Sequence, residues 1–119
     1  MALRTATAAI DLGHLEQYTT GDEALLGEIL TLFCEQVERC LLSLNPTTDD
    51  TAWRDACHSL KGAARGVGAW KLGDLAAEGE ALIGDIEGVH EARPAQLKKI
   101  REGAADAIEC AIALCQRPG

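Results

Sequence analysis

The strongest constraint on the fold is a run of apolar residues at three- and four-residue spacings between Asp22 and Leu44. Its members are Leu25, Leu26, Ile29, Leu30, Phe33, Val37, Cys40, Leu41 and Leu44. This spacing places them on one face of an α-helix. Asp22 is a suitable N-cap, because its carboxylate can accept a hydrogen bond from an amide of the first turn. The segment therefore predicts a long amphipathic helix whose apolar face other helices must cover.

Similar spacings recur in the rest of the chain, with glycine and proline between the segments. The expected helices are a short one near residues 11–19, the long one over 22–44, one from about 50 to Gly66–Gly68, one from 69 or 70 to between Gly84 and Gly88, and one that follows Pro94, a residue suited to a first turn. The apolar set of the fourth helix includes Leu72, Leu75, Leu82, Ile83 and Ile86. No segment shows strand-like alternation, and no internal repeat is present. We expect an all-α fold, an antiparallel up-and-down four-helix bundle with a short extra N-terminal helix over one end.

Length and composition limit the classes of protein to which the chain can belong. With 119 residues it matches one compact domain over residues 1–119, in which we expect 1–9 to be a loosely ordered tail. A formal net charge of −8 argues against a nucleic-acid binder, which would need basic patches. No apolar run approaches the roughly 20 residues of a spanning helix, so we expect a soluble protein with no membrane association. The five cysteines show no C-x-x-C spacing and fall mostly at apolar positions, which indicates reduced core thiols and a cytoplasmic location.

A basic stripe interrupts this acidic chain in the helix expected after residue 50. Arg54, His58, Lys61 and Arg65 follow one another at spacings that place them on one side of that helix. The apolar residues Trp53, Cys57, Leu60 and Ala64 form a different stripe that should face the core. We therefore expect the imidazole of His58 to be accessible from outside the bundle.

The residues around His58 suit phosphoryl chemistry. Gly62 lies one turn after His58, where a side chain would lean back over the ring, so its absence opens the approach for a partner. Lys61 and Arg65 place positive charge within reach of a group bound to the ring, and cations stabilise phosphoryl oxygens. A neutral imidazole is a good nucleophile. No carboxylate–histidine–serine or carboxylate–histidine–cysteine arrangement is suggested, so the pattern does not favour hydrolysis by a triad.

The segment HSLKGAARGVGAWKLGDLAAEGE resembles the signature of histidine-containing phosphotransfer (HPt) domains, in which H-x-x-K-G precedes a glycine, spaced leucines and an acidic residue. The matching positions are His58, Lys61, Gly62, Gly68, Leu72, Leu75 and Glu80. The preceding segment, IDLGHLEQYTTGDEALLGEILTLFCEQ, resembles the first two helices of that family. One departure is Gly66, where family members often carry asparagine.

This resemblance implies roles for individual residues. His58 would be the phosphorylated residue, Lys61 would assist with the phosphoryl group, and Gly62 would clear space for the partner. Arg65 is a further candidate through its charge. Gln36 could occupy the place of a helix-two glutamine that lies near the imidazole in some relatives, although an ordinary exposed glutamine is the simpler interpretation. Glu80 could pair with Lys61 or Arg65 across the helices, and a solvated carboxylate is its simpler interpretation.

The resulting hypothesis is a phosphorelay carrier. His58 would take a phosphoryl group from the aspartyl phosphate of a receiver domain, in a response regulator or a hybrid histidine kinase, and pass it to another receiver. The chain would be a stoichiometric intermediate and not an enzyme, with no ATP-binding domain, no metal and no cofactor of its own, while Mg²⁺ is expected on the partner receiver. We expect a monomer that docks through Ala63, Ala69 and the edge of the helix over 22–44.

Two alternatives stay open at this stage. One is a non-catalytic helical adaptor that binds a receiver or histidine kinase without accepting phosphate. The other is the dimerising segment of a sensor kinase, but those segments carry an H-E-type motif followed by proline. Here Ser59 follows His58 and no proline is near. Gel filtration would separate an obligate dimer of that kind from a monomeric carrier.

Overall fold

Helices account for the regular structure of the chain. The computed structural model describes residues 8–116, and within them there are five α-helices and no strand. The helices are α2 (Leu12–Thr19), α3 (Glu23–Ser43), α4 (Asp50–Gly66), α5 (Trp70–Glu80) and α6 (Val89–Gln116). The expected all-helical class is confirmed. Of the expected tail, residues 1–7 lie outside the described residues, and Ala8 and Ala9 precede α2 without helical structure.

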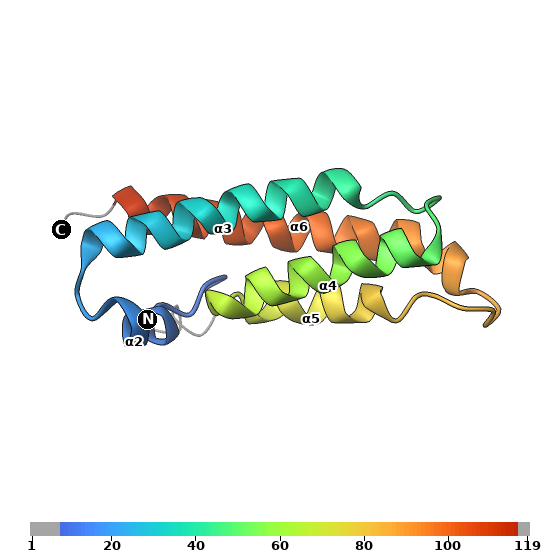
Figure 1. Ribbon diagram of the computed structural model, residues 1–119, viewed down its shortest axis with the longest axis horizontal. Coiled ribbons are helices and arrows are strands. Elements are labelled where there is room, and N and C mark those ends of the chain that lie inside the picture. Colours follow the sequence, from blue (N-terminus) through green and yellow to red (C-terminus); the bar gives the residue numbers. More distant parts are fainter. Residues whose placement is uncertain (1–7, 117–119) are drawn as a thin grey trace.

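The four long helices pack around a common core. α3 contacts α4 and α6, and α5 also contacts α4 and α6, so the contacts close into a ring. Figure 1 shows the chain running along α3, back along α4, out again along α5 and back along α6. α2 contacts α3 and lies across one end of the bundle in the same view. This arrangement places α4 between α3 and α5, with one side toward each.

Aspartates start the first three helices. The side chains of Asp11, Asp22 and Asp49 each accept a hydrogen bond from an amide in the first turn, at 3.1, 3.0 and 2.8 Å. Such caps satisfy donors that have no partner inside the helix. The predicted starts of these three helices are confirmed to within one or two residues, because the cap is a local signal that a sequence carries on its own.

The core consists mainly of leucine, isoleucine, valine and alanine. Its largest fully buried side chains include Trp53, Leu30, Leu60 and Ile100. Burying a leucine-sized side chain stabilises the fold by about 1.5–3 kcal/mol relative to leaving it exposed. Within residues 8–116 no helix has the length and continuous apolar character that crossing a bilayer requires.

The turn between α4 and α5 depends on Gly68. Its φ of +79° is a left-handed conformation that residues with a side chain rarely adopt. A Cβ at Gly68 would also lie 2.8 Å from the Cβ of Asp11, and the Gly68 carbonyl accepts a hydrogen bond from the Asp11 amide at 2.9 Å. Gly68 therefore shapes the turn, and the turn additionally holds the start of α2.

The predicted end of α5 is wrong. We expected the helix to continue to a point between Gly84 and Gly88, but it ends at Glu80. Leu82, Ile83 and Ile86 follow helical spacing, yet tertiary contacts bind this segment as a loop. The Leu82 carbonyl accepts from Arg93 Nε at 3.0 Å, and the Gly84 amide donates to Asp50 Oδ2 at 2.8 Å.

The predicted start of α6 is also wrong. The helix begins at Val89, so Pro94 lies inside it and not in its first turn. The extra turn places two residues beside Asp50: His90 Nε2 lies 2.8 Å from Asp50 Oδ1, and Arg93 donates to the same oxygen at 2.6 Å. We call Asp50, His90 and Arg93 the Arg93 cluster. Its contacts offset the cost of a proline that lacks the amide expected to donate to the His90 carbonyl.

The cysteines are all free thiols. Cys40 and Cys57 are buried, Cys34 and Cys110 are partly buried, and Cys115 is exposed. Burial raises the pKa of the Cys57 thiol to about 12, with the charge of Glu80 as the next cause. The expectation of core thiols therefore holds fully for two of the five and fails for Cys115.

Candidate functional site

His58 and Lys61 lie on the side of α4 that faces α5, and both contact Glu80, the last residue of α5. His58 Nδ1 lies 2.8 Å from Glu80 Oε2, and Lys61 Nζ donates to Glu80 Oε1 at 2.6 Å. The spacing of three residues places the two α4 side chains next to each other on the helix surface. One carboxylate therefore accepts from both, and we call these three residues the His58 site.

The Glu80 contact determines which nitrogen of His58 is reactive. An ionised carboxylate can only accept hydrogen bonds, so Nδ1 must carry the proton that it donates to Glu80. Nε2 then keeps its lone pair, and no hydrogen bond joins it to any group within residues 8–116. The His58 side chain is 68% exposed. The expectation of an accessible imidazole on the basic side of α4 agrees with this geometry.

Electrostatics keep Glu80 ionised. The hydrogen bond from Lys61 is the main cause that lowers the pKa of Glu80, and the bond from His58 lowers it further. Partial burial opposes both, since it disfavours the charged form. The Glu80 side chain is 23% exposed, as is that of Lys61. The site therefore pairs an ionised carboxylate with the ammonium group of Lys61 and the imidazole of His58.

Gly62 leaves the surface beside His58 open. It is exposed, and a Cβ at this position would meet no atom within 4 Å. Internal packing therefore gives no reason for a glycine at position 62, in contrast to Gly68. The missing side chain makes a flat area of helix one turn after the imidazole, as expected if a bulky partner must approach the ring.

The structure does not bring the other two candidates into the His58 site. Arg65 pairs with Asp74 on α5 at 3.5 Å, and its aliphatic stem covers Gly73. Gln36, on α3, accepts from Arg39 at 2.8 Å. It also lines a hollow between α3 and α4 together with Ser59. Gln36 therefore borders the side of α4 opposite to the one that carries Lys61.

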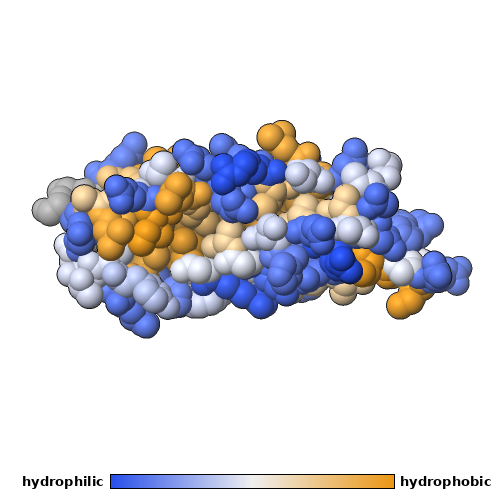
Figure 2. All heavy atoms as spheres, viewed as in Figure 1, coloured by the Kyte–Doolittle hydropathy of each residue, from blue (hydrophilic) through white to orange (hydrophobic). Residues whose placement is uncertain are grey.

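An apolar stripe runs along α3. Leu25, Ile29 and Leu32 precede Gln36 at spacings of three and four residues, so the four lie along one side of the helix. Leu32 is 62% exposed and Leu25 is 36% exposed. Figure 2 shows hydrophobic surface over the first half of α3, toward α2 and the end of α4.

On α4, the expected docking residue Ala63 is partly exposed, which keeps it available for a partner. Ala69, also expected to contact a partner, is fully buried and cannot do so from this position. It packs in the core at the turn where α4 meets α5, because the left-handed Gly68 directs the chain inward there.

No metal centre is evident beside these residues. Within residues 8–116 no three histidine, cysteine, aspartate or glutamate side chains gather closely enough to share a metal ion. The groups around the His58 ring are the carboxylate of Glu80, the ammonium group of Lys61 that it holds, and the open helix surface at Gly62.

Glu80 is the site residue whose importance the sequence interpretation underestimated. It was considered as a partner of Lys61 or Arg65, but a solvated carboxylate was the simpler interpretation. The structure pairs it with Lys61 and, in addition, with His58. A signal was present, because Glu80 is the acidic residue that ends the matched motif.

Comparison with known proteins identifies the family. No curated protein and no solved structure matches this chain. The family model described as Hpt domain matches residues 28–110, more than half of the chain, and this range includes His58, Lys61, Gly62 and Glu80. Hpt domains are histidine phosphotransfer modules of phosphorelays; they interact with receiver domains and histidine kinases and contain no kinase or ATP-binding domain. On the motif, the helical fold and this match, the chain belongs to the Hpt domain family.

Proposed function

We propose that this chain is a phosphorelay carrier in which His58 accepts a phosphoryl group from the aspartyl phosphate of a receiver domain and passes it to another receiver aspartate. The observation that carries the proposal is the state of the imidazole. Nδ1 is bonded to Glu80, while Nε2, on a ring that is 68% exposed, has no partner among residues 8–116. A nucleophile held in this way needs no separate base, because the attacking nitrogen carries no proton.

The transfer step balances with the groups present. The lone pair of Nε2 attacks the phosphorus, an N–P bond forms, and the P–O bond to the receiver carboxylate breaks. The electron pair of that bond leaves with the carboxylate of the donor aspartate. The ring becomes positively charged while Nδ1 keeps its proton, and the ionised Glu80 at 2.8 Å stabilises that charge. The reverse step, on a second receiver, restores the neutral ring.

Lys61 would stabilise the phosphoryl oxygens. In the free protein its ammonium group is held by Glu80 at 2.6 Å, one turn from the ring. A phosphoryl group on Nε2 offers a second anionic partner within the reach of a flexible lysine side chain. Mg²⁺ bound to the receiver's acidic pocket would supply further charge neutralisation. We assign no role in this step to Arg65 and Gln36, which lie outside the His58 site with Asp74 and Arg39 as their partners.

The partner would dock on the side of the bundle formed by α3 and α4. Leu25, Ile29 and Leu32 supply exposed apolar area, and Ala63 and Gly62 extend it toward the ring. A helix of the receiver could lie along this surface with its phosphorylated aspartate above His58. We propose that the chain works as a cytoplasmic monomer, with the four long helices as an antiparallel up-and-down bundle that keeps the site rigid.

The test uses a panel of receiver domains carrying radiolabelled phosphoryl groups. The full chain should acquire an acid-labile label that maps to His58, and His58→Gln should show no label above background with unchanged helicity by circular dichroism. His90→Gln is the matched control and should be labelled like the unmodified chain. Labelling that persists in His58→Gln contradicts the assignment. Binding of a receiver without any labelling of the unmodified chain supports the adaptor alternative instead.

A further inference from the structure

Glu80 occupies a place in the helix that does not favour a fixed side chain. It is the last residue of α5, an 11-residue helix with no side-chain hydrogen bond capping its start. Helix ends fray, because their last carbonyls have no partner inside the helix. Glu80 nevertheless holds both His58 and Lys61 at short distances. Contacts outside the His58 site must therefore fix the end of α5.

The first such contact is a buried hydrogen bond from α4. Trp53 Nε1 donates to the carbonyl of Gly79 at 2.7 Å, and the Trp53 side chain is fully buried. This carbonyl is one of the last four of α5, which have no i+4 donor within the helix, and it also accepts from the Leu82 amide at 3.0 Å. A buried hydrogen bond is costly to break, because the separated groups cannot turn to water. Trp53 thus attaches the end of α5 to α4.

The second contact is the close packing of Gly79 itself. A Cβ at Gly79 would lie 3.0 Å from Cys57 Sγ and 3.2 Å from Ile100 Cδ1, so a methyl group would fit there only if these neighbours gave way by a few tenths of an ångström. Cys57 directly precedes His58, and Gly79 directly precedes Glu80. The packed pair, Cys57 and Gly79, therefore lies directly beside the hydrogen-bonded pair, His58 and Glu80, along both helices.

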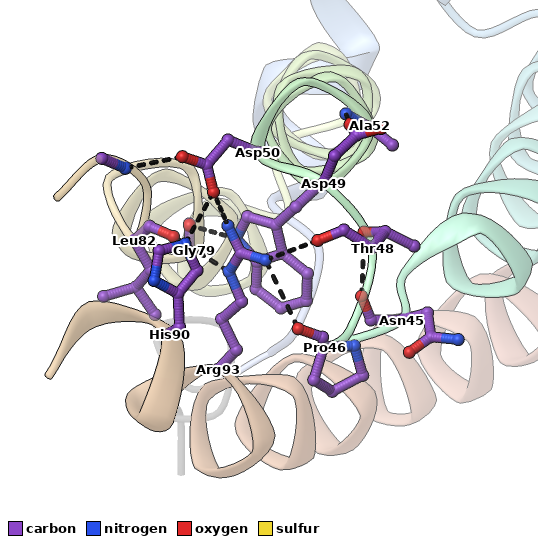
Figure 3. A network of polar contacts seen from close by, with 12 residues as sticks. Asn45, Pro46, Thr48, Asp49, Asp50, Ala52, Gly79, Leu82, His90 and Arg93 are labelled. Atoms are coloured by element: carbon purple, nitrogen blue, oxygen red, sulfur yellow. Dashed lines mark hydrogen bonds and ion pairs between the residues drawn. The ribbon is translucent and has the colours of Figure 1, made fainter.

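The chain beyond Glu80 is also held. The Leu82 carbonyl accepts from Arg93 Nε at 3.0 Å, and Arg93 is fully buried. Figure 3 shows Gly79 and Leu82 next to the Arg93 side chain. Residues on both sides of Glu80 are thus bonded to the interior, which leaves its side chain little freedom to move away from α4.

We propose that Trp53 and Gly79 are positioning residues for the phosphoacceptor: together they hold the end of α5 where Glu80 fixes the proton of His58 on Nδ1 and leaves Nε2 free. Neither residue touches the reacting atoms. The effect on which nitrogen of His58 carries the proton follows from the geometry alone, whereas the effect on phosphoryl transfer rests on the proposed function. The two effects can be measured separately.

Nitrogen-15 NMR of the His58 ring in the full chain tests the effect on the ring, because the shifts of the two nitrogens report which one is protonated. The unmodified chain should show the Nδ1–H form as the major neutral species. Gly79→Ala should move population to the Nε2–H form, because the added methyl group displaces α5 from α4. Gly103→Ala is the matched control: its methyl group meets Leu75 Cδ1 at 2.9 Å between α5 and α6, and it should leave the ring shifts unchanged.

A second variant separates positioning from general damage. In the Gly79→Ala background, Cys57→Ala removes the sulfur that lies nearest to the new methyl group, and it should restore much of the Nδ1–H form. Trp53→Phe keeps the aromatic ring without the indole donor and should shift the ring population in the same direction as Gly79→Ala. Unchanged ring shifts in folded Gly79→Ala, or no recovery in the double variant, would overturn the proposal.

Transfer from a phosphorylated receiver gives the second readout. Gly79→Ala should be about tenfold slower than the unmodified chain, as expected when a group that orients a reactive histidine is displaced. Gly103→Ala should transfer at the unmodified rate. If the unmodified chain accepts no phosphoryl group, the proposed function fails, and the ring shifts still decide whether Trp53 and Gly79 position His58.

Discussion

The His58 site and the Arg93 cluster are built from the same kinds of group. In each, a carboxylate lies 2.8 Å from a histidine nitrogen and 2.6 Å from a cationic nitrogen. Glu80 binds His58 and Lys61, and Asp50 binds His90 and Arg93. The His58 site and the Arg93 cluster cannot be distinguished by their charged groups or by these distances.

The cations differ in how many partners they have. Arg93 is fully buried, stacks 4.9 Å from the centre of the Trp53 ring and donates to three backbone carbonyls besides Asp50. Lys61 is partly exposed and is bonded to Glu80. Arg93 therefore cannot leave without breaking several buried bonds, whereas Lys61 can turn to an incoming anion. A cation that would have to break many bonds in order to move thus belongs to a structural cluster. A cation that would have to break few can serve a reactive site.

The largest expected effect is on stability, in Arg93→Met. Removing the guanidinium takes away the donor to the carbonyls of Pro46, Thr48 and Leu82, while Asp50 keeps its contacts with Gly84 and His90. Asp50 is 39% exposed, so the main cost is that of the carbonyls left unpaired. Such a group costs about 1–3 kcal/mol, and we expect a loss of unfolding free energy of at least about that size by urea denaturation. Lys61→Met is the matched cation in the His58 site and should cost at most about 1 kcal/mol. Equal losses in the two variants would break the comparison.

The next effect is on transfer, in Glu80→Gln. The amide has no charge to stabilise the phosphorylated ring or to hold Lys61, and its NH₂ group can donate to Nδ1 and reverse the tautomer. We expect transfer from a phosphorylated receiver to slow by about 10- to 100-fold, measured by rapid-quench labelling. Asp50→Asn is the control and should transfer at nearly the unmodified rate. A similar slowing in both variants would mean that carboxylates affect transfer only through the fold.

The smallest effect is the dependence of stability on pH. The bond from the Gly84 amide, followed by that from His90, lowers the pKa of Asp50 to about 2. A lowered pKa stabilises the fold above the unfolded value of about 3.9, and this contribution is lost as the pH falls from about 4 to 2. Urea denaturation over this range should show a shallower decline for Asp50→Asn than for the unmodified chain. An unchanged slope would show that the Asp50 contacts do not persist in solution.

The helices that depend on local signals could be predicted, and those that depend on tertiary contacts could not. Asp11 and Asp22 marked the starts of α2 and α3 because a cap bonds to its own first turn. The predictions for the end of α5 and the start of α6 were wrong because Arg93, a buried residue of α6, binds the Leu82 carbonyl. A signal for this burial was present, since Arg93 falls on the apolar stripe of Leu97, Ile100, Ala104 and Ala107.

The placement of the candidate site residues could be predicted where they share one helix. His58, Lys61 and Gly62 follow from their spacing on one helix and lie as that spacing requires. The bond between His58 and Glu80 joins residues 22 positions apart, so it depends on how α4 and α5 pack, which spacing does not give. Arg65 shares the stripe of His58 and yet turns to Asp74 on the neighbouring helix. The spacing of residues along a helix thus predicts the face on which a side chain lies, but not the residue with which that side chain pairs.

The open Nε2 beside the apolar stripe of α3 has a kinetic consequence for a carrier of the proposed kind. Phosphoryl donor and phosphoryl acceptor must reach the same atom over the same surface, so they cannot be bound together and have to take turns. Throughput then depends on how quickly a spent donor dissociates. An excess of unphosphorylated receiver would slow the relay by occupying the carrier.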